Sequence, residues 1–389
     1  MTRINRLLLF TFIESFATIL IERGVYFYTD ELLKFTNRQN LLLAFAFGVV
    51  YAVAALLSHR LARRLGEKRL LALVVAGQCL SHLVMCLFPA SAVLVAGDMG
   101  IALCNGLKWP VVESYISAGR TPLGAAPIIG RFNLAWSISV PLAMFAAGPL
   151  IGSGWPWLLF ALPALVNLVS LVLIIPLPRV PEHLAVDHPD RLAPAILSRY
   201  RLLTSAARWS MLSGYCLLFV LAPLMPTIFG TRLNYSVAAA TALAGITDVA
   251  RVAAFVLMMI TVRWHGRRYP LLAGTVLMPL GFLAAMYGPD VTTVIIGEII
   301  FGAAAGVAYH AALYYALVVA NAAVAAGGEH EGLIGAGFAL GPLAALLGQM
   351  AGNAVGRPEL GILIGVAPII LIGLGASLVP LARVRPPAV

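Results

Sequence analysis

The sequence predicts an all-α integral membrane protein with twelve transmembrane helices in two pseudo-symmetric six-helix bundles. Hydrophobic residues make up 61% of the chain and charged residues only 11%, well below the roughly 25% charged residues of a soluble domain. A soluble chain of 389 residues could not bury so much apolar side chain in one core. The apolar segments have the length of about 20 residues that crosses a bilayer as a helix. They lack the alternation of a membrane β-barrel.

Six membrane spans are expected in each half of the chain. Those of the first half are 7–29, 41–58, 70–88, 92–117, 132–152 and 156–177. Those of the second half are 207–230, 236–261, 270–288, 292–319, 332–354 and 360–382. The longest polar stretch lies between the halves and contains Pro181 and Pro189, as in a linker that joins two domains. We therefore predict an N-terminal bundle at 1–178, a cytoplasmic linker at 179–206 and a C-terminal bundle at 207–389.

The basic residues predict the orientation of the spans. About 19 of the 26 Lys and Arg residues fall on one side of this topology, and the other side holds only Lys34, Arg38, Arg232 and Arg357. The positive-inside rule then places both termini in the cytoplasm of a cell-membrane protein. The same bias explains the net charge of +10. Since no basic face is interleaved with exposed aromatic residues, no nucleic-acid partner is expected.

The sequence gives no sign of catalysis or of a cofactor. The four cysteines all lie within predicted spans, and we interpret them as small packing residues: Cys79, Cys86, Cys104 and Cys216. They suggest neither a disulfide framework nor a metal cluster. The chain contains no Gly-rich nucleotide-binding loop and no nucleophile–base set. We therefore expect no enzyme activity, no cofactor and no metal ion.

A basic turn occurs twice in the chain, two hundred residues apart. Residues 63–69 lie between the second and third spans, and residues 263–268 lie between the eighth and ninth. Repeated halves with matched turns are typical of transporters that rock around a central site. The predicted gating residues of the turns are Arg64, Gly66, Lys68, Arg69, Gly266, Arg267 and Arg268.

The first of these turns resembles the signature loop of the major facilitator superfamily. Positions Arg64, Gly66, Lys68 and Arg69 match that loop, while His59 replaces its first glycine and Arg63 replaces its acid. The resemblance implies the fold of the family, in which the first, fourth, seventh and tenth helices line a central cavity. In the family the acid also helps to latch the bundles in the outward-open state. Its replacement by Arg63 predicts a weak latch.

A second resemblance concerns the direction of transport. Gly148-Pro149 in the fifth span and Gly341-Pro342 in the eleventh are similar to the Gly-Pro motif of the superfamily's antiporters. The resemblance implies export. The alternative is a helix kink where two helices cross closely.

Charged residues within the spans are the main functional candidates, because a charge at the bilayer centre costs at least roughly 2.5–3.5 kcal/mol. With a rise of about 1.5 Å per residue, Glu14 and Lys108 come to similar depths in spans 1 and 4, which predicts an ion pair. The same argument pairs Arg23 with Asp98. Asp248 and Arg251 stand three apart on one helix and are expected to pair with each other. For each pair, the alternative is a purely structural salt bridge.

These charges and their neighbours give the candidate site. The predicted substrate-binding residues are Lys108, as partner of an anionic group, and Asn105, Trp109, His310, Tyr309 and Tyr314. The predicted proton-coupling acids are Glu14, Glu22, Asp98 and Glu298. The predicted gating residues within the spans are Arg23, Asp248 and Arg251. His310 can titrate near neutral pH, and its alternative is a hydrogen-bonded packing residue.

The sequence thus predicts a secondary active transporter of a small organic solute. We expect it to be coupled to protons and to work by rocker-switch alternating access, as a monomer surrounded by membrane lipids. The alternative is a transport-dead receptor or a lipid scramblase built on the same fold. The identity of the substrate and the direction of transport are open at this point.

Overall fold

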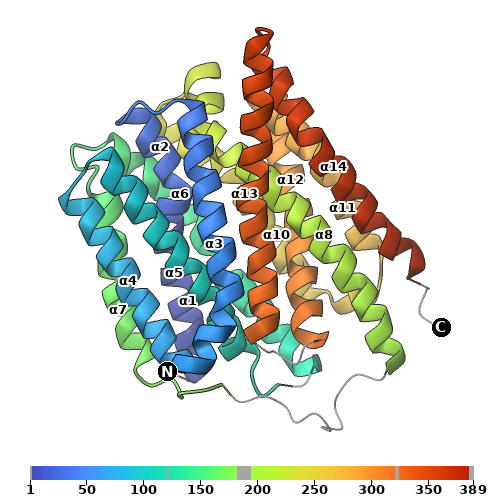
Figure 1. The fold of residues 1–389 in the computed structure, drawn as a ribbon. Coiled ribbons are helices and arrows are strands. Elements are labelled where there is room, and N and C mark those ends of the chain that lie inside the picture. Colours follow the sequence, from blue (N-terminus) through green and yellow to red (C-terminus); the bar gives the residue numbers. More distant parts are fainter. Residues whose placement is uncertain (1, 121, 182–193, 320–323, 385–389) are drawn as a thin grey trace.

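The computed structural model describes residues 2–120, 122–181, 194–319 and 324–384, and these residues form helices and short connections without a β-strand (Figure 1). The first half contains α1 Arg3–Glu22, α2 Gly24–Glu31, α3 Asn37–Leu65, α4 Glu67–Leu87, α5 Ser91–Ser117, α6 Pro122–Gly152 and α7 Leu158–Ile174. The second half contains α8 Pro194–Met225, the π-helix η1 Pro226–Arg232, α9 Val237–Ala244, α10 Ile246–Ile260, the 3₁₀ turn η2 Val262–Trp264, α11 Tyr269–Tyr287, α12 Val291–Val319, α13 Val324–Ala354 and α14 Pro358–Arg383. Every predicted span coincides with one helix or with two consecutive helices.

In the described part of the chain, ten helical segments are long and apolar enough to cross a membrane. The two other spans are α5 and α7. Helix α7 has only 17 residues, and α5 carries three charged side chains, Asp98, Lys108 and Glu113. Burial of these three charges inside the protein allows α5 to remain a membrane helix.

Two spans that the sequence presents as continuous are broken. The first span changes from α1 to α2 at Arg23, whose φ and ψ are −115° and −38°. The eighth span changes from α9 to α10 at Gly245. Arg23 Nη2 donates to the carbonyl oxygen of Ala244 at 3.4 Å, so the two breaks face each other. Interrupted helices leave backbone groups that side chains can satisfy, and transporters use such interruptions at their central sites.

The two halves meet along several helix contacts, among them that of α5 with α13. Helix α3 lies beside α13, as Figure 1 shows, and α6 packs against α9 and α10. Glycines permit the close approach. A Cβ atom at Gly48 of α3 would lie 2.3 Å from Ala339 N, and one at Gly148 of α6 would lie 2.2 Å from Thr241 Oγ1. Gly148 belongs to the Gly-Pro pair, so its contact agrees with the close-crossing interpretation of that motif.

The seventh span begins earlier than predicted. Helix α8 starts at Pro194 and so includes residues 194–206, which the sequence predicts to belong to the linker. Pro189 and the rest of 182–193 lie outside the described residues. The exact domain limits remain a prediction.

The packing of Gly48 can be tested by substitution. Gly48→Val places a branched side chain against the backbone of α13, so we expect a loss of stability of about 1–3 kcal/mol from overpacking. Thermal unfolding of the purified protein in detergent measures this loss. Gly154→Val is the control, because nothing lies within 4 Å of a Cβ atom there. Equal melting temperatures for the two variants would contradict the close contact.

Candidate functional site

A cavity of about 80 Å³ lies between the two halves. Its charged lining residues are Glu22, Arg23, Arg251 and Glu331. Its aromatic lining residues are Tyr51, Trp109, Phe132, Trp136, Tyr215, Phe219, Tyr309 and Phe338. Helices α1, α5, α8 and α12 contribute, which are the first, fourth, seventh and tenth spans. Helices α3, α6, α10 and α13 contribute as well. The family resemblance therefore identified only half of the lining helices.

Asp248 joins the two halves beside this cavity. Its Oδ2 accepts a hydrogen bond from Arg23 Nη1 at 2.9 Å, across the boundary between the halves. Its other oxygen accepts from Arg251 Nη2 on its own helix, which confirms the predicted internal pair. The guanidinium of Arg251 also lies 5.1 Å from the centre of the Trp136 ring in the first half. One buried acid thus holds two arginines that belong to different halves.

The predicted pair of Arg23 with Asp98 is wrong, because Arg23 binds Asp248 instead. Matching depth gives the height of a side chain along the membrane normal but not its direction around the helix. The break at Arg23 turns its side chain toward α10. Asp98 is buried, and its Oδ1 has no hydrogen-bond partner among the described residues. The same is true of both carboxylate oxygens of Glu298, another of the predicted proton-coupling acids.

The predicted pair of Glu14 with Lys108 is confirmed, at 2.8 Å between Nζ and Oε2. Both side chains are fully buried. Lys108 Nζ also donates to Gln78 Oε1 at 3.0 Å, and the other oxygen of Glu14 accepts from Asn167 at 2.9 Å. Asn167 in turn accepts from His82 at 2.8 Å. These contacts satisfy the two charges within the first half of the chain.

Three members of this network were not predicted from the sequence: Gln78, His82 and Asn167. Asn105, a predicted binding residue, belongs to it, because its side-chain oxygen accepts from Gln78 at 2.6 Å and from Thr18 at 3.2 Å. The only signal for such residues would be polar side chains in apolar spans. Lys108 and Asn105 are fully buried and do not line the cavity.

The other predicted binding residues divide into two groups. Trp109 and Tyr309 line the cavity, and Lys108 Nζ lies 4.6 Å from the centre of the Trp109 ring. His310 accepts a hydrogen bond from Asn133 of the opposite half at 3.1 Å, which agrees with its packing alternative. Tyr314 lies away from the cavity and stacks on His265 with ring centres 4.5 Å apart.

The basic turns have the backbone geometry that their glycines permit. Gly66 has φ 82° and Gly266 has φ 70°, a region that favours glycine. Lys68 Nζ donates to the carbonyl oxygen of Ile175, and the amide of Gly266 donates to the Tyr315 hydroxyl at 3.0 Å. Burial lowers the pKa of His265 in the second turn. The two turns are therefore each fixed to their own half.

The basic side chains of the turns differ in their exposure. Arg64, Arg69 and Arg267 are exposed, and the guanidinium of Arg268 lies 5.5 Å from the centre of the Tyr269 ring. These side chains remain available to the membrane surface. Their predicted gating role stays a prediction.

Sequence comparison decides the family. The family model described as Major Facilitator Superfamily matches residues 7–326. The chain belongs to the major facilitator superfamily. A transporter of this family is a multi-pass membrane protein that moves small-molecule solutes, and the repeated turns and apolar helices agree with that assignment. A comparison with curated protein sequences finds no match.

Solved structures of the same fold support this assignment. The human organic anion transporter MFSD10 (TETRAN) is similar over 98% of both chains, with a TM-score of 0.69 and 15% identity. The nucleoside transporter NupG, in a D323A mutant, is similar over 98% of both chains, with a TM-score of 0.65 and 14% identity. A bacterial homologue of the human lysosomal transporter Spinster, inward-facing and unoccupied, covers 98% of this chain and 95% of its own, with a TM-score of 0.63 and 17% identity. At these identities the likeness concerns the fold alone.

The buried network of the first half leads to a double-mutant test. Lys108→Gln leaves Glu14 buried without its cation, so we expect a loss of about 3–5 kcal/mol in unfolding free energy. Adding Glu14→Gln removes the uncompensated charge and should restore at least half of that loss. Denaturant unfolding in detergent measures both, with Arg38→Gln at an exposed position as the control. Additive losses in the double variant would show that the two charges are not coupled.

Proposed function

We propose that this protein is a secondary active transporter of a small organic solute, coupled to protons and working by alternating access. The observation that carries the proposal is the cavity between the halves, which has inter-half contacts on both sides. Toward the end with the basic turns, these include Tyr51 with Glu331 and Asn133 with His310. Toward the opposite end, they include Arg23 with Asp248. Breaking one set while keeping the other would open the cavity to one side at a time.

The chemistry of the cavity favours an organic solute. Charged groups of both signs and aromatic rings line the same space, which suits a molecule with an apolar body and a charged group. Arg23 and Arg251 line the cavity and can meet an anionic group. Lys108, predicted for this role, lies outside the lining in this conformation. Two structural neighbours are named as transporters of organic anions and of nucleosides, which are organic solutes.

An excess of buried acids supports proton coupling. Among the described residues, the buried acids are Glu14, Asp98, Glu113, Asp248, Glu298 and Glu331, while the buried Lys and Arg residues are Arg23, Lys108 and Arg251. A carboxylate removed from water is stable only with a compensating partner, and a proton is one such partner. Glu22 lines the cavity itself and stands next to Arg23. We therefore keep Glu22, Asp98 and Glu298 as the coupling acids, with Glu14 tied to Lys108.

The position of Arg23 suggests how the halves open. When the halves part at this end, Arg23 leaves Asp248, but Asp248 keeps Arg251 on its own helix. Asp248 therefore keeps one cationic partner when the halves part, and this lowers the free energy of opening. We propose Arg23, Asp248 and Arg251 as the gate at this end. We also propose that the protein lies in a cell membrane with both termini in the cytoplasm. Export, implied by the Gly-Pro resemblance, is the direction we propose.

Proton coupling can be tested in proteoliposomes with a pH gradient, after a solute has been found by a thermal-shift screen. We expect Glu22→Gln to abolish accumulation of the solute while counterflow exchange continues, because exchange needs no net proton movement. Glu359→Gln, at an exposed position of α14, is the control and should behave as the wild type. Accumulation by Glu22→Gln at the wild-type level would exclude Glu22 as the coupling acid. Movement of lipid without any solute would instead indicate a scramblase.

The role of the basic turn gives a separate kinetic prediction. Gly66→Val forces a β-branched residue into a backbone conformation that favours glycine, while the space around the position is open. We expect slower turnover with substrate affinity within about twofold of the wild type, because binding at the cavity is unchanged. Transport rates and equilibrium binding measure the two quantities. A large loss of affinity with unchanged turnover would place the turn in the binding site.

A further inference from the structure

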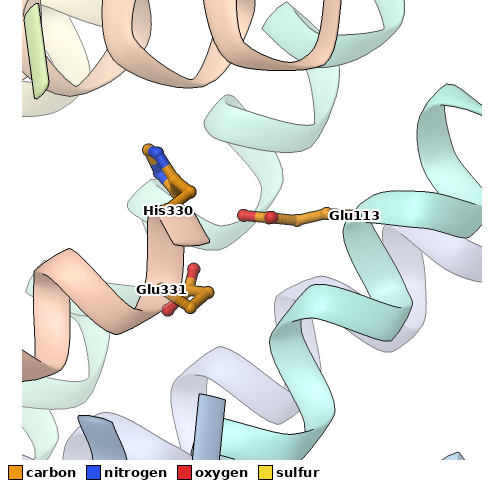
Figure 2. Close-up of side chains that lie close together, drawn as sticks. All are labelled: Glu113, His330 and Glu331. Atoms are coloured by element: carbon orange, nitrogen blue, oxygen red, sulfur yellow. The ribbon is translucent and has the colours of Figure 1, made fainter. Parts of the chain in front are cut away.

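A cluster of three titratable side chains lies where α5 of the first half meets α13 of the second. We call Glu113, His330 and Glu331 the interbundle cluster. One potential ligand atom from each lies within 4.8 Å of the others, and all three side chains are buried. Figure 2 shows Glu113 reaching from its helix toward the helix that carries His330 and Glu331. The cluster therefore contains groups from both halves.

The imidazole of His330 indicates that the cluster takes a ligand. His330 has no exposed surface, and neither ring nitrogen has a hydrogen-bond partner among the described residues. Buried polar atoms are rarely left without a partner. The ring of Tyr309 packs edge-on against the imidazole at 5.1 Å between ring centres. Imidazole is the commonest metal ligand among protein side chains, and a metal ion would satisfy one of its nitrogens.

Neighbouring residues hold the two carboxylates in place. The Tyr51 hydroxyl donates a hydrogen bond to Glu331 Oε2. Gly327 provides space for the other acid, because a Cβ atom there would lie 2.8 Å from Glu113 Oε2. Metal-binding carboxylates are commonly oriented by such surrounding hydrogen bonds.

We propose that the interbundle cluster binds a divalent metal ion of the zinc type. Once both glutamates have lost their protons, the two carboxylates and a neutral imidazole carry a charge that a divalent cation balances. Nitrogen with carboxylate oxygen is also a common donor set for zinc. Bonds of about 2.0–2.2 Å to the ion require the three ligand atoms to lie closer together than 4.8 Å. Small rotations of the long glutamate side chains supply that movement.

The bound ion would hold this end of the transporter closed. Glu113 belongs to the first half, whereas His330 and Glu331 belong to the second, so the three ligands are together only when α5 and α13 are in contact. A ligand that binds one conformation alone shifts the equilibrium toward it. Metal binding is therefore expected to oppose opening of the cavity toward the end with the basic turns.

Titration of the purified full-length protein with Zn²⁺ by calorimetry tests the site. We expect one Zn²⁺ per chain, with affinity reduced at least tenfold by Glu113→Gln and by His330→Ala. Glu329→Gln is the matched control, because Glu329 precedes His330 on α13 but is 62% exposed and pairs with Arg208 at 3.1 Å. Absence of binding to the wild type would overturn the proposal. Wild-type affinity in both cluster variants would also overturn it.

Hydrogen exchange of the wild-type protein provides a second measurement. It needs no variant, so it tests the proposal even where a variant fails to fold. We expect Zn²⁺ to slow exchange of the backbone amides at 326–337 and EDTA to reverse the effect. Exchange that is unchanged by Zn²⁺ would exclude the closing role. Neither experiment uses a transported solute, so a negative result is independent of the proposed transport activity.

Discussion

The free-energy cost of charge inside an apolar helical bundle constrains this structure most. A group that stays charged away from water needs a partner of opposite charge, and the two halves meet this need differently for their ion pairs. The first half encloses Glu14 and Lys108 in its own polar network, which includes residues of four helices. The second half holds Asp248 with Arg251 and shares that acid with Arg23. The first arrangement fixes one bundle, and the second connects the two.

This difference matters for a protein whose halves must separate and rejoin. A network confined to one bundle is unaffected by the relative motion of the two bundles. Its hydrogen bonds can therefore remain formed, and water excluded from it, throughout a transport cycle. A contact shared between bundles has to break, and its partners need alternatives when it does. Asp248 has such an alternative in Arg251, whereas Arg23, which already lines the cavity, would lose its carboxylate partner. The buried charges of the first half thus stabilise one bundle internally, whereas Asp248 and Arg23 form a contact that changes when the bundles move.

Glycine and proline positions complete this arrangement at the level of the backbone. Gly48 and Gly148 bring helices of opposite halves so close that backbone atoms meet directly, with no large side chains between them. The breaks at Arg23 and Gly245 lie against each other, and the buried side chain of Arg23 donates to the carbonyl oxygen of Ala244. Close packing at these positions makes the contact between the halves sensitive to small displacements, as a two-state transition requires.

The sequence by itself determined the number of spans, the repeat and the family resemblance, because apolar length and turn chemistry are local properties. It also predicted the Glu14–Lys108 and Asp248–Arg251 pairs, since depth and helical spacing suffice when the partners face each other. It paired Arg23 wrongly, because the direction of a side chain around its helix depends on a break that no local pattern revealed. Only the tertiary structure decided that Lys108 is enclosed, that Arg23 and Glu331 face the cavity, and that Glu113 meets His330. These facts depend on how the two bundles rotate and pack against each other, and contacts between residues 217 positions apart leave no mark in sequence spacing.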